Sequence, residues 1–276
     1  MIAYFGHPKS GSTWLSGFFL GLAYDLGLKI FYDQTTFYRN KPEVIANTNP
    51  DIVISQNSSY EAIESLDNLK ALHVIRDPRD LLISSYYSSL YSHNIEGWPE
   101  LSQLRIELEK TTFDNGLILV MDFMQSEILH MKTWNYNDPR ILEFKFETFI
   151  ENPIKHLNQT LAYFDLIDHK EKFAGSVNVV SFGNRVFNRV GLYNKVRFKK
   201  KKVSGDYAEQ VNKKLSFKSL SKGRDRGQEN KTSHYRSGKP GEWKNSFKKE
   251  HIDHFHSLFD DLLIAMGYEN SENWNY

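Results

Sequence analysis

A glycine-containing segment near the N-terminus combines backbone and side-chain groups that can bind phosphate. It reads Gly6-His7-Pro8-Lys9-Ser10-Gly11-Ser12-Thr13-Trp14 and follows a short apolar run, Ile2 to Phe5. A turn of this kind between a strand and a helix directs backbone N–H groups at an anion, and the helix N-terminus adds a favourable dipole. Lys9 supplies a cation, and the hydroxyl groups of Ser12 and Thr13 supply further donors. The segment therefore predicts a phosphate site.

The position of the lysine distinguishes this loop from the common nucleoside-triphosphate loop. In G-x-x-x-x-G-K-[ST] the lysine directly follows the second glycine. Gly6 and Gly11 have the required spacing, but Lys9 stands two residues before Gly11. This difference argues against an ordinary ATPase or kinase. A phosphoryl transferase that uses ATP and Mg²⁺, and a nucleotide-binding module without catalysis, are kept as alternatives.

One family has a loop of this form. Pro8-Lys9-Ser10-Gly11-Ser12-Thr13-Trp14 resembles the P-K-S-G-[ST]-T-W loop of cytosolic sulfotransferases. These enzymes use 3′-phosphoadenosine 5′-phosphosulfate (PAPS) and release 3′-phosphoadenosine 5′-phosphate (PAP). The resemblance implies that the loop from Pro8 to Trp14, with Ser10 and Gly11, binds the donor and that Ser12 and Thr13 hold its 5′-phosphate. Lys9 would stabilise the departing phosphate, and the fold would be P-loop-like.

Two later segments resemble the elements that bind the 3′-phosphate in the same family. Arg76-Asp77-Pro78-Arg79-Asp80 begins a string similar to R-[ND]-P-[KR]-D-x-x-x-S-x-Y, in which Ser84 has the serine position. Arg236-Ser237-Gly238-Lys239-Pro240-Gly241-Glu242-Trp243-Lys244-Asn245 is similar to R-K-G-x-x-G-[DE]-W-K-N, with Ser237 where lysine is usual. By resemblance, the 3′-phosphate ligands are Arg76, Ser84, Arg236, Ser237 and Gly238.

Two shorter stretches extend the resemblance. Phe144 to Pro153 is similar to L-K-Y-E-D-L-x-x-[DN]-P, and Val180-Ser181-Phe182 resembles a T-S-F segment that lines the adenine. The resemblance implies that Trp14 and Phe182 enclose the base. Core packing explains either aromatic ring equally well.

The proton acceptor of the reaction is where the sequence departs from the family. A hydroxyl acceptor must lose its proton, and family members use a histidine at the end of the strand before the Arg76 strand. Gln56 has that position here, and glutamine is not a base at neutral pH. Asp33 is one candidate for the base, since other sulfotransferase branches place a carboxylate soon after the first helix. His7 is a second candidate. A third possibility is an amine or guanidine acceptor, which needs less help to lose its proton. We favour Asp33.

The elements that position these residues alternate between strand and helix. Buried strands are expected at Ile2–Phe5, Leu28–Tyr32, Asp51–Ser55, Ala71–Ile75 and Ile141–Phe146. Helices are expected at Ser12–Leu26, Asp80–Ser92 and Pro153–Phe164, with helical character again over Trp243–Met266. This alternation predicts one α/β domain over residues 1–276, with a central parallel sheet and helices on both faces.

Positive charge is concentrated towards the C-terminus. Residues 185–249 hold 20 Lys and Arg against 5 Asp and Glu, although the whole chain has a net charge of +1. The alternation of strand and helix fails between about Gly183 and Gly241. We interpret residues 185–235 as a flexible basic lid whose cations attract the anionic donor. Aromatic residues are not regularly interleaved with the lysines, so we expect no nucleic-acid partner.

Composition limits the remaining possibilities. The chain has no cysteine, which excludes disulfides, thiolate metal sites and cysteine nucleophiles. No apolar run approaches the roughly 20 residues that span a bilayer. We therefore expect a cytoplasmic protein that uses PAPS, no metal and no membrane partner, and that acts on a small molecule.

Overall fold

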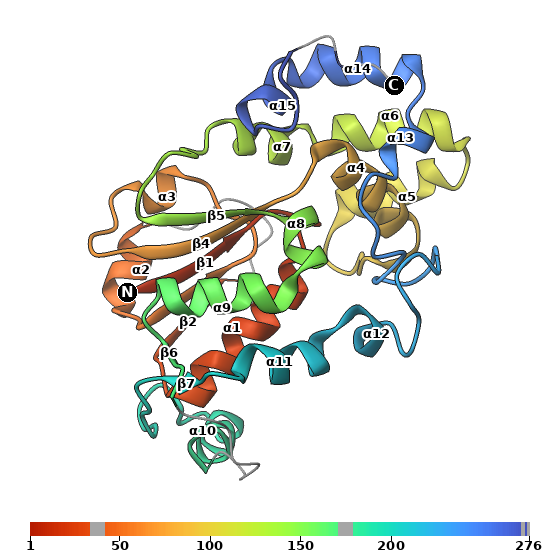
Figure 1. The fold of residues 1–276 in the computed structure, drawn as a ribbon. Helices are drawn as coiled ribbons and strands as arrows, with labels where there is room; N and C mark the ends of the chain where they lie inside the picture. Colours follow the sequence, from red (N-terminus) through yellow and green to blue (C-terminus); the bar gives the residue numbers. More distant parts are fainter. Residues whose placement is uncertain (34–41, 171–178, 272–273, 275–276) are drawn as a thin grey trace. The chain divides into compact units, whose positions relative to one another are not determined.

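The computed structural model describes residues 1–33, 42–170, 179–271 and 274. These residues form two compact units, shown in Figure 1. The first unit comprises Met1–Ile75 and Asn135–Ser216, and the second comprises Arg76–Trp134 and Phe217–Tyr276. No helix within the described ranges is long and apolar enough to cross a membrane.

The first unit is built on a parallel five-stranded sheet, as predicted. Its spatial order is β2-β3-β1-β4-β5. The strands are β1 (Ile2–Gly6), β2 (Ile30–Asp33), β3 (Ile52–Ser55), β4 (Lys70–Ile75) and β5 (Ile141–Lys145). Because β1 lies between β3 and β4, the chain changes its direction of winding there, and ligands of open parallel sheets bind at the carboxyl ends of strands at such a point.

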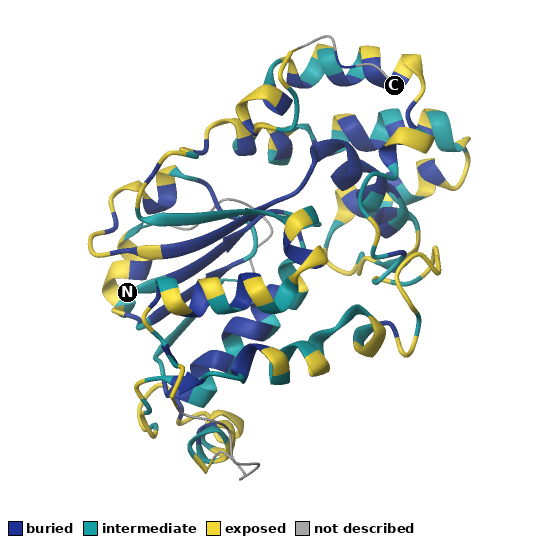
Figure 2. Ribbon diagram, viewed as in Figure 1, coloured by how far each residue is buried: buried dark blue, intermediate teal, exposed yellow. Residues whose placement is uncertain are grey.

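Three helices bury one face of this sheet. They are α1 (Ser12–Leu26), α9 (Pro153–Tyr163) and α11 (Tyr207–Leu215). Tyr4 and Leu72 from the strands belong to the same core cluster as Phe19 and Leu22 of α1 and Leu161 of α9. Figure 2 shows the buried strands and the buried stripe of α1 in dark blue. Apolar residues recur along one face of each helix and at alternate positions of the strands. When these two apolar surfaces pack together, they form this layer.

Smaller elements complete the first unit. They are α2 (Pro42–Thr48), α3 (Glu61–Glu64), α8 (Phe146–Glu151), α10 (Val179–Arg189) and the short parallel pair β6 (Ile167–Asp168) and β7 (Val203–Ser204). The strand predicted from Leu28 begins later, because the N–H of Leu28 bonds to the carbonyl of Ala23 and completes the end of α1. The shift brings Asp33 into β2.

The second unit is helical. Its elements are α4 (Pro78–Tyr87), the π-helical turn η1 (Ser88–Ser92), α5 (Pro99–Leu108), α6 (Phe113–Phe123), α7 (Gln125–Lys132), α12 (Phe217–Leu220), α13 (Trp243–Ser246), α14 (Lys249–Phe259) and α15 (Leu262–Ala265). The helix predicted over Asp80–Ser92 begins two residues earlier, because Asp77 accepts a hydrogen bond from the Arg79 N–H and caps α4 before Pro78.

The basic segment contains regular elements that the sequence did not reveal. Residues 183–241 include most of α10, and β7, α11 and α12. The buried Asn184 amide donates to the carbonyl groups of Tyr24 and Phe198, at 2.8 and 2.9 Å, and accepts from the Phe198 N–H at 2.8 Å. These contacts fasten α10 to the last turns of α1. A single polar side chain makes these contacts, and the spacing of apolar residues in the sequence gives no sign of them.

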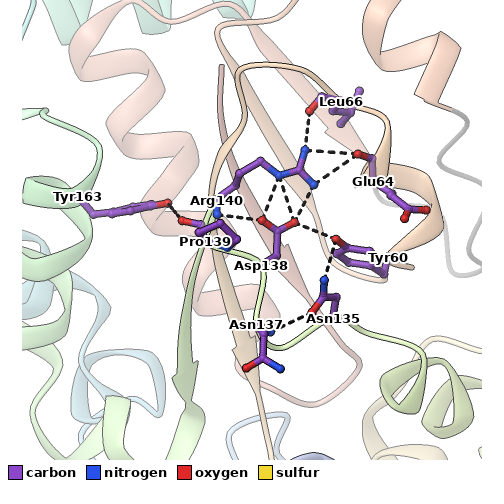
Figure 3. A network of polar contacts seen from close by, with 9 residues as sticks. All are labelled: Tyr60, Glu64, Leu66, Asn135, Asn137, Asp138, Pro139, Arg140 and Tyr163. Atoms are coloured by element: carbon purple, nitrogen blue, oxygen red, sulfur yellow. Dashed lines mark hydrogen bonds and ion pairs between the residues drawn. The ribbon is translucent and has the colours of Figure 1, made fainter.

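A polar network fixes the start of β5 (Figure 3). The Asp138 carboxylate accepts from the Arg140 guanidinium at 2.7 Å and from the Tyr60 hydroxyl at 2.9 Å. Arg140 also donates to the carbonyl of Leu66 at 2.9 Å. The network therefore joins the end of α3 to the residue that precedes β5, the strand on which Glu143 lies opposite His73.

We predict that Asp138→Asn destabilises the protein in a pH-dependent way. Hydrogen bonds from Arg140 lower the pKa of Asp138 from 3.8 to about 2. The stabilisation is therefore complete above pH 3.8 and is lost as pH falls through about 2. We expect a loss of about 2 kcal/mol in the free energy of unfolding at pH 7, measured by urea denaturation, that shrinks towards pH 2.5.

The matched control is Asp165→Asn. Asp165 forms an ion pair with Lys202 but is 80% exposed, and exposed pairs contribute little. Equal losses for the two variants at pH 7, or a loss for Asp138→Asn that does not change with pH, would contradict the role of the buried network.

Candidate functional site

The loop between β1 and α1 has a left-handed backbone at two positions. The φ angle is +61° at Lys9 and +76° at Gly11. A Cβ atom on Gly11 would lie 2.6 Å from Cε2 of Phe146, so only glycine fits there. The N–H of Ser10 donates to the carbonyl of His7 at 3.3 Å. The loop is thus a tight turn of the kind predicted.

The start of α1 favours an anion. No side chain caps the helix, and no acidic residue stands in its first turn, where Ser12 and Thr13 lie. The positive end of the helix dipole is therefore not neutralised by a carboxylate of the cap or first turn. The Ser10 hydroxyl is buried and has no hydrogen-bond partner among the described residues. A phosphate oxygen would satisfy it, so the loop fits a phosphate group.

The predicted pair of aromatic rings is not brought together. Trp14 packs edge-on against Phe149, with ring centroids 5.2 Å apart. Phe182 is 64% exposed and lies on α10, which is fastened to the last turns of α1. Because α1 has 15 residues, its two ends are about 22 Å apart. Phe182 therefore does not line the phosphate loop at the other end of the helix.

One row of residues crosses the whole sheet on the face opposite α1. The row follows from the strand register, in which neighbouring residues of a parallel sheet point to the same side. It consists of Asp33, Ser55, Phe5, His73 and Glu143, from β2, β3, β1, β4 and β5 respectively. Asp33 and Glu143 thus lie on the two edge strands, near the carboxyl ends where the loop begins.

Gln56 has a structural role at the expected position of the base. Its side-chain amide donates to the Ser16 hydroxyl and to the Tyr32 hydroxyl, each at 3.0 Å. The residue therefore ties β3 to α1 and β2. An amide held in this way positions its neighbours and takes no proton.

His7 belongs to a buried chain of titratable side chains. Its Nε2 lies 2.8 Å from Nε2 of His73, and Nδ1 of His73 lies 2.7 Å from Oε2 of Glu143. Both histidines are fully buried. Burial lowers the pKa of His73 well below 6.5 and raises the pKa of Glu143 from 4.5 to about 9. About a quarter of the Glu143 side chain is exposed, but its Oε1 is buried.

In the second unit, Asp80 joins the two segments that resemble 3′-phosphate elements. Its carboxylate accepts from the backbone N–H of Gly241 and, at 3.0 Å, from that of Trp243. Arg79 lies over the ring of Trp243, 3.7 Å from its centroid. Arg76 follows β4 directly and is 8% exposed. Two segments about 160 residues apart are therefore held together.

Arg236 lies against α4. Its guanidinium is 4.6 Å from the ring centroid of Tyr87, which is one turn after Ser84. The same guanidinium pairs with Glu229 at 2.6 Å and with Glu242. Ser84 and Arg236 are thus brought to one region of the second unit, where Arg236 is paired to two carboxylates.

The turn after Arg236 includes an aromatic residue that sequence reasoning missed. Gly238 has φ +67°, and a Cβ atom there would lie 2.7 Å from Cδ2 of Phe217. The buried Ser237 accepts from the N–H of Lys239 at 3.3 Å. Ser216-Phe217 is one of three Ser-Phe pairs in the sequence, together with Ser181-Phe182 and Ser246-Phe247, so the pair alone did not single out Phe217. Phe217, rather than Phe182, lies beside the Gly238 turn.

A cluster of two acidic residues and one histidine does not indicate a metal site. Asp114, Glu250 and His251 have potential ligand atoms within 4.8 Å of one another. The His251 ring already accepts from the N–H of Lys248 at 2.9 Å and contacts the carbonyl of Asp114 at 3.1 Å. One ring nitrogen therefore caps the start of α14, and the other joins α14 to α6.

The chain is similar to known proteins in sequence and in fold. The family described as sulfotransferase domain matches residues 2–185 and 191–267. Cytosolic sulfotransferase 17 of Arabidopsis thaliana is 21% identical over 97% of this chain and 75% of its own. The structure of mouse sulfotransferase SULT7A1 complexed with PAP aligns with a TM-score of 0.55 and 14% identity, over 99% of this chain and 89% of that one. This structural likeness shows the fold.

We predict that Gly11→Ala disrupts the loop. The left-handed φ costs an alanine about 1–2 kcal/mol, and its methyl group would displace the Phe146 ring. We expect a lower melting temperature and at least tenfold weaker PAP binding by calorimetry.

Gly21→Ala is the control, because Gly21 lies inside α1 with nothing within 4 Å of its Cβ position. Alanine should stabilise the helix there by about 0.5–1 kcal/mol and leave PAP binding intact. Normal PAP affinity in Gly11→Ala would count against the loop as the phosphate site.

Proposed function

Since the chain belongs to the sulfotransferase-domain family, we propose that it transfers a sulfuryl group from PAPS to a small-molecule acceptor. One observation carries the proposal most directly. The tight turn with left-handed Lys9 and Gly11 stands at the carboxyl end of the central strand and at the start of α1. Backbone donors, a helix N-terminus and a lysine then converge on one anion.

The first unit would hold the 5′ end of the donor. Pro8 and Gly11 shape the turn, and the hydroxyl groups of Ser10, Ser12 and Thr13 donate to phosphate oxygens. PAPS supplies the reactive sulfuryl group when bound. The ammonium of Lys9 would stabilise the charge that develops on the phosphate as that group departs.

The second unit would hold the 3′-phosphate. Arg76 and Arg236 can each donate two hydrogen bonds to phosphate oxygens, and Ser84 adds a hydroxyl on α4. The left-handed Gly238 leaves room for a close approach of the backbone to the ligand. Phe217, which packs against that glycine, is our candidate for contact with the adenine in place of Phe182.

Asp33 is our candidate for the base. It is half-buried and ends β2, one residue after the tyrosine that contacts Gln56. His7 is fully buried and bonded to His73, which makes it a poor acceptor for a proton from a ligand. Asp33 would take the proton of an acceptor hydroxyl as its oxygen bonds to sulfur.

Two broader assignments are part of the proposal. The match to the sulfotransferase domain extends over residues of both units, which supports one domain over residues 1–276, with residues 185–235 as its basic lid. The absence of cysteine and the likeness to a cytosolic relative support a cytoplasmic location.

We predict different failures for Lys9→Ala and Arg76→Ala. Lys9→Ala should lower kcat by about 10²–10³ while PAP binding changes less, because its interaction strengthens in the transition state. Arg76→Ala should weaken PAP binding by at least about tenfold, because a charged hydrogen bond contributes roughly 1.5–3 kcal/mol. Calorimetry with PAP and turnover of PAPS measure both.

Arg189→Ala is the control for these variants, because Arg189 is an exposed cation of α10. Arg189→Ala should retain the wild-type kcat and the wild-type affinity for PAP. PAP affinity that is unchanged in Arg76→Ala, or turnover that is unchanged in Lys9→Ala, would contradict the corresponding assignment. Stabilisation by ATP with Mg²⁺ but not by PAP would contradict the function itself.

Asp33→Asn should abolish sulfation of hydroxyl acceptors and leave PAP affinity within about twofold, because asparagine keeps the shape but has no basic oxygen. Asp67→Asn, at an exposed position before β4, is the matched control and should keep full activity. Unchanged turnover of a hydroxyl acceptor by Asp33→Asn would refute Asp33 as the base.

A further inference from the structure

One helix of the first unit has its apolar side turned outward. Val179, Phe182, Val186 and Val190 follow one another at intervals of three or four residues, which places them along one side of α10. All four are exposed, by between 39% and 75%. Asn184 stands two residues from Phe182 and from Val186, so it points to the opposite side, and it is fully buried. A helix on the surface of a globular protein normally buries its apolar side, and α10 does the reverse.

Polar contacts hold α10 in this orientation. The Asn184 amide is bonded to the end of α1 and to the chain that returns after α10. The buried Tyr193 hydroxyl contacts two carbonyl groups at and just beyond the end of α1, at 2.8 and 2.7 Å. The N–H of Lys200 donates to a carbonyl of the last turn of α1 at 3.0 Å. Residues 179–202, which we call the α10 module, are therefore fastened to α1 through their polar groups.

The apolar surface of the module continues beyond the helix. Phe198 is exposed, and its ring centroid is 5.5 Å from that of Phe187. A Cβ atom on Gly183 would lie 2.6 Å from the Phe198 ring, so Phe198 lies directly beside α10. Leu192 and Val196, in the returning chain, are exposed as well. Single exposed apolar side chains are ordinary, but a group of them on one ordered segment marks an interaction surface.

The α10 module is strongly cationic. It holds eight Lys and Arg and no Asp or Glu. The ion pairs that join it to carboxylates elsewhere in the first unit are Arg185 with Asp25 at 3.7 Å, Arg197 with Asp51 at 3.5 Å and Lys202 with Asp165 at 2.6 Å. The remaining exposed cations include Arg189, Lys195, Lys199 and Lys201. Because the cations outnumber these carboxylates by eight to three, the module attracts an anionic surface.

Charge and apolar surface together select the occupant. A second copy of the chain would bring two cationic modules against each other, and their charges repel. Single-stranded nucleic acid binds by stacking on aromatic rings, whereas Val179, Val186 and Val190 are aliphatic. An anionic bilayer matches both features, because apolar side chains enter the boundary between headgroups and acyl chains while the cations meet the lipid phosphates.

We propose that the α10 module is a membrane-surface site that docks the first unit onto a bilayer of anionic lipids. The apolar side of α10 lies in the interface, and the cations beside it bind the headgroups. This departs from the sequence-based expectation of no membrane partner, which considered only a run long enough to span a bilayer. A helix that lies on the surface needs no such run. The cytoplasmic leaflet is the anionic one, which agrees with the location proposed above.

This assignment separates two parts of the basic segment. The α10 module is fastened to the end of α1 opposite the phosphate loop, about 22 Å away along the helix. Its cations are therefore poorly placed to attract a donor to the loop. The lid proposed above then depends on the cations of residues 203–235, and those of residues 185–202 serve the lipid surface.

Sedimentation with lipid vesicles tests the site without any nucleotide, so the result does not depend on the proposed function. The probes are vesicles of phosphatidylcholine that contain about 30% phosphatidylserine, and vesicles of phosphatidylcholine alone. The wild type should sediment with the anionic vesicles and stay in solution with the neutral ones. Added salt should weaken the binding, because it screens the charges.

Phe182→Ser combined with Val190→Ser tests the apolar side. This variant should bind the anionic vesicles at least tenfold more weakly than the wild type, because it removes apolar surface that enters the bilayer. Both side chains are exposed, so its melting temperature should stay close to that of the wild type. The matched control is Val44→Ser combined with Ile106→Ser, at two exposed apolar positions outside the module, which should bind as the wild type does.

Lys199→Gln combined with Lys201→Gln tests the charge. Each cation near an anionic bilayer strengthens binding by about fivefold, so this variant should bind at least about tenfold more weakly. Lys110→Gln combined with Lys155→Gln removes two exposed cations outside the module and should have little effect.

Several results would overturn the proposal. They are binding to neutral vesicles that equals binding to anionic ones, and vesicle binding that either module variant retains in full. Absence of vesicle binding by a wild-type dimer that Phe182→Ser with Val190→Ser dissociates, measured by analytical ultracentrifugation, would assign this face to a second copy of the chain. Absence of vesicle binding by a monomer would reject the lipid surface in favour of an acidic protein partner.

Discussion

The parallel pairing of β1 with β3 on one side and β4 on the other is the constraint on which the site of the first unit depends. It directs the carboxyl ends of the strands to one edge of the sheet. The loop after β1 and Asp33 at the end of β2 therefore come from distant sequence positions to the same edge. Apolar burial of the sheet against α1 holds this register, because a slip of one residue would turn His73 and Glu143 towards the helix layer.

Charged side chains hold loops in place in both units. In the second unit they hold loops in place: Asp77 caps α4, and Asp80 binds the backbone of the turn at Gly241. In the first unit the Asp138–Arg140 pair has the same kind of role at the start of β5. We propose Arg76 and Arg236 as the cations that bind the 3′-phosphate, and Arg236 is balanced by Glu229 and Glu242.

The departure from the family at Gln56 has a structural consequence. An amide replaces the expected histidine and ties β3 to its neighbours. Two buried histidines lie elsewhere, His73 on β4 and His7 in the loop after β1. A histidine beside the loop invites its assignment as the base. Its burial and its contact with His73 argue against that role. We therefore propose Asp33, which ends β2, for proton removal.

The sequence by itself determined the parts that depend on local pattern. Periodicity located α1 and the five strands to within two residues, and the spacing of Lys9 and Gly11 identified the loop, because apolar alternation and turn chemistry are local properties. It misplaced Phe182 and missed Phe217, and it did not reveal α10 or the chain from His7 to Glu143. Those features depend on contacts between residues far apart in the chain. Register and burial, which exist only in the folded protein, decide which side chains meet.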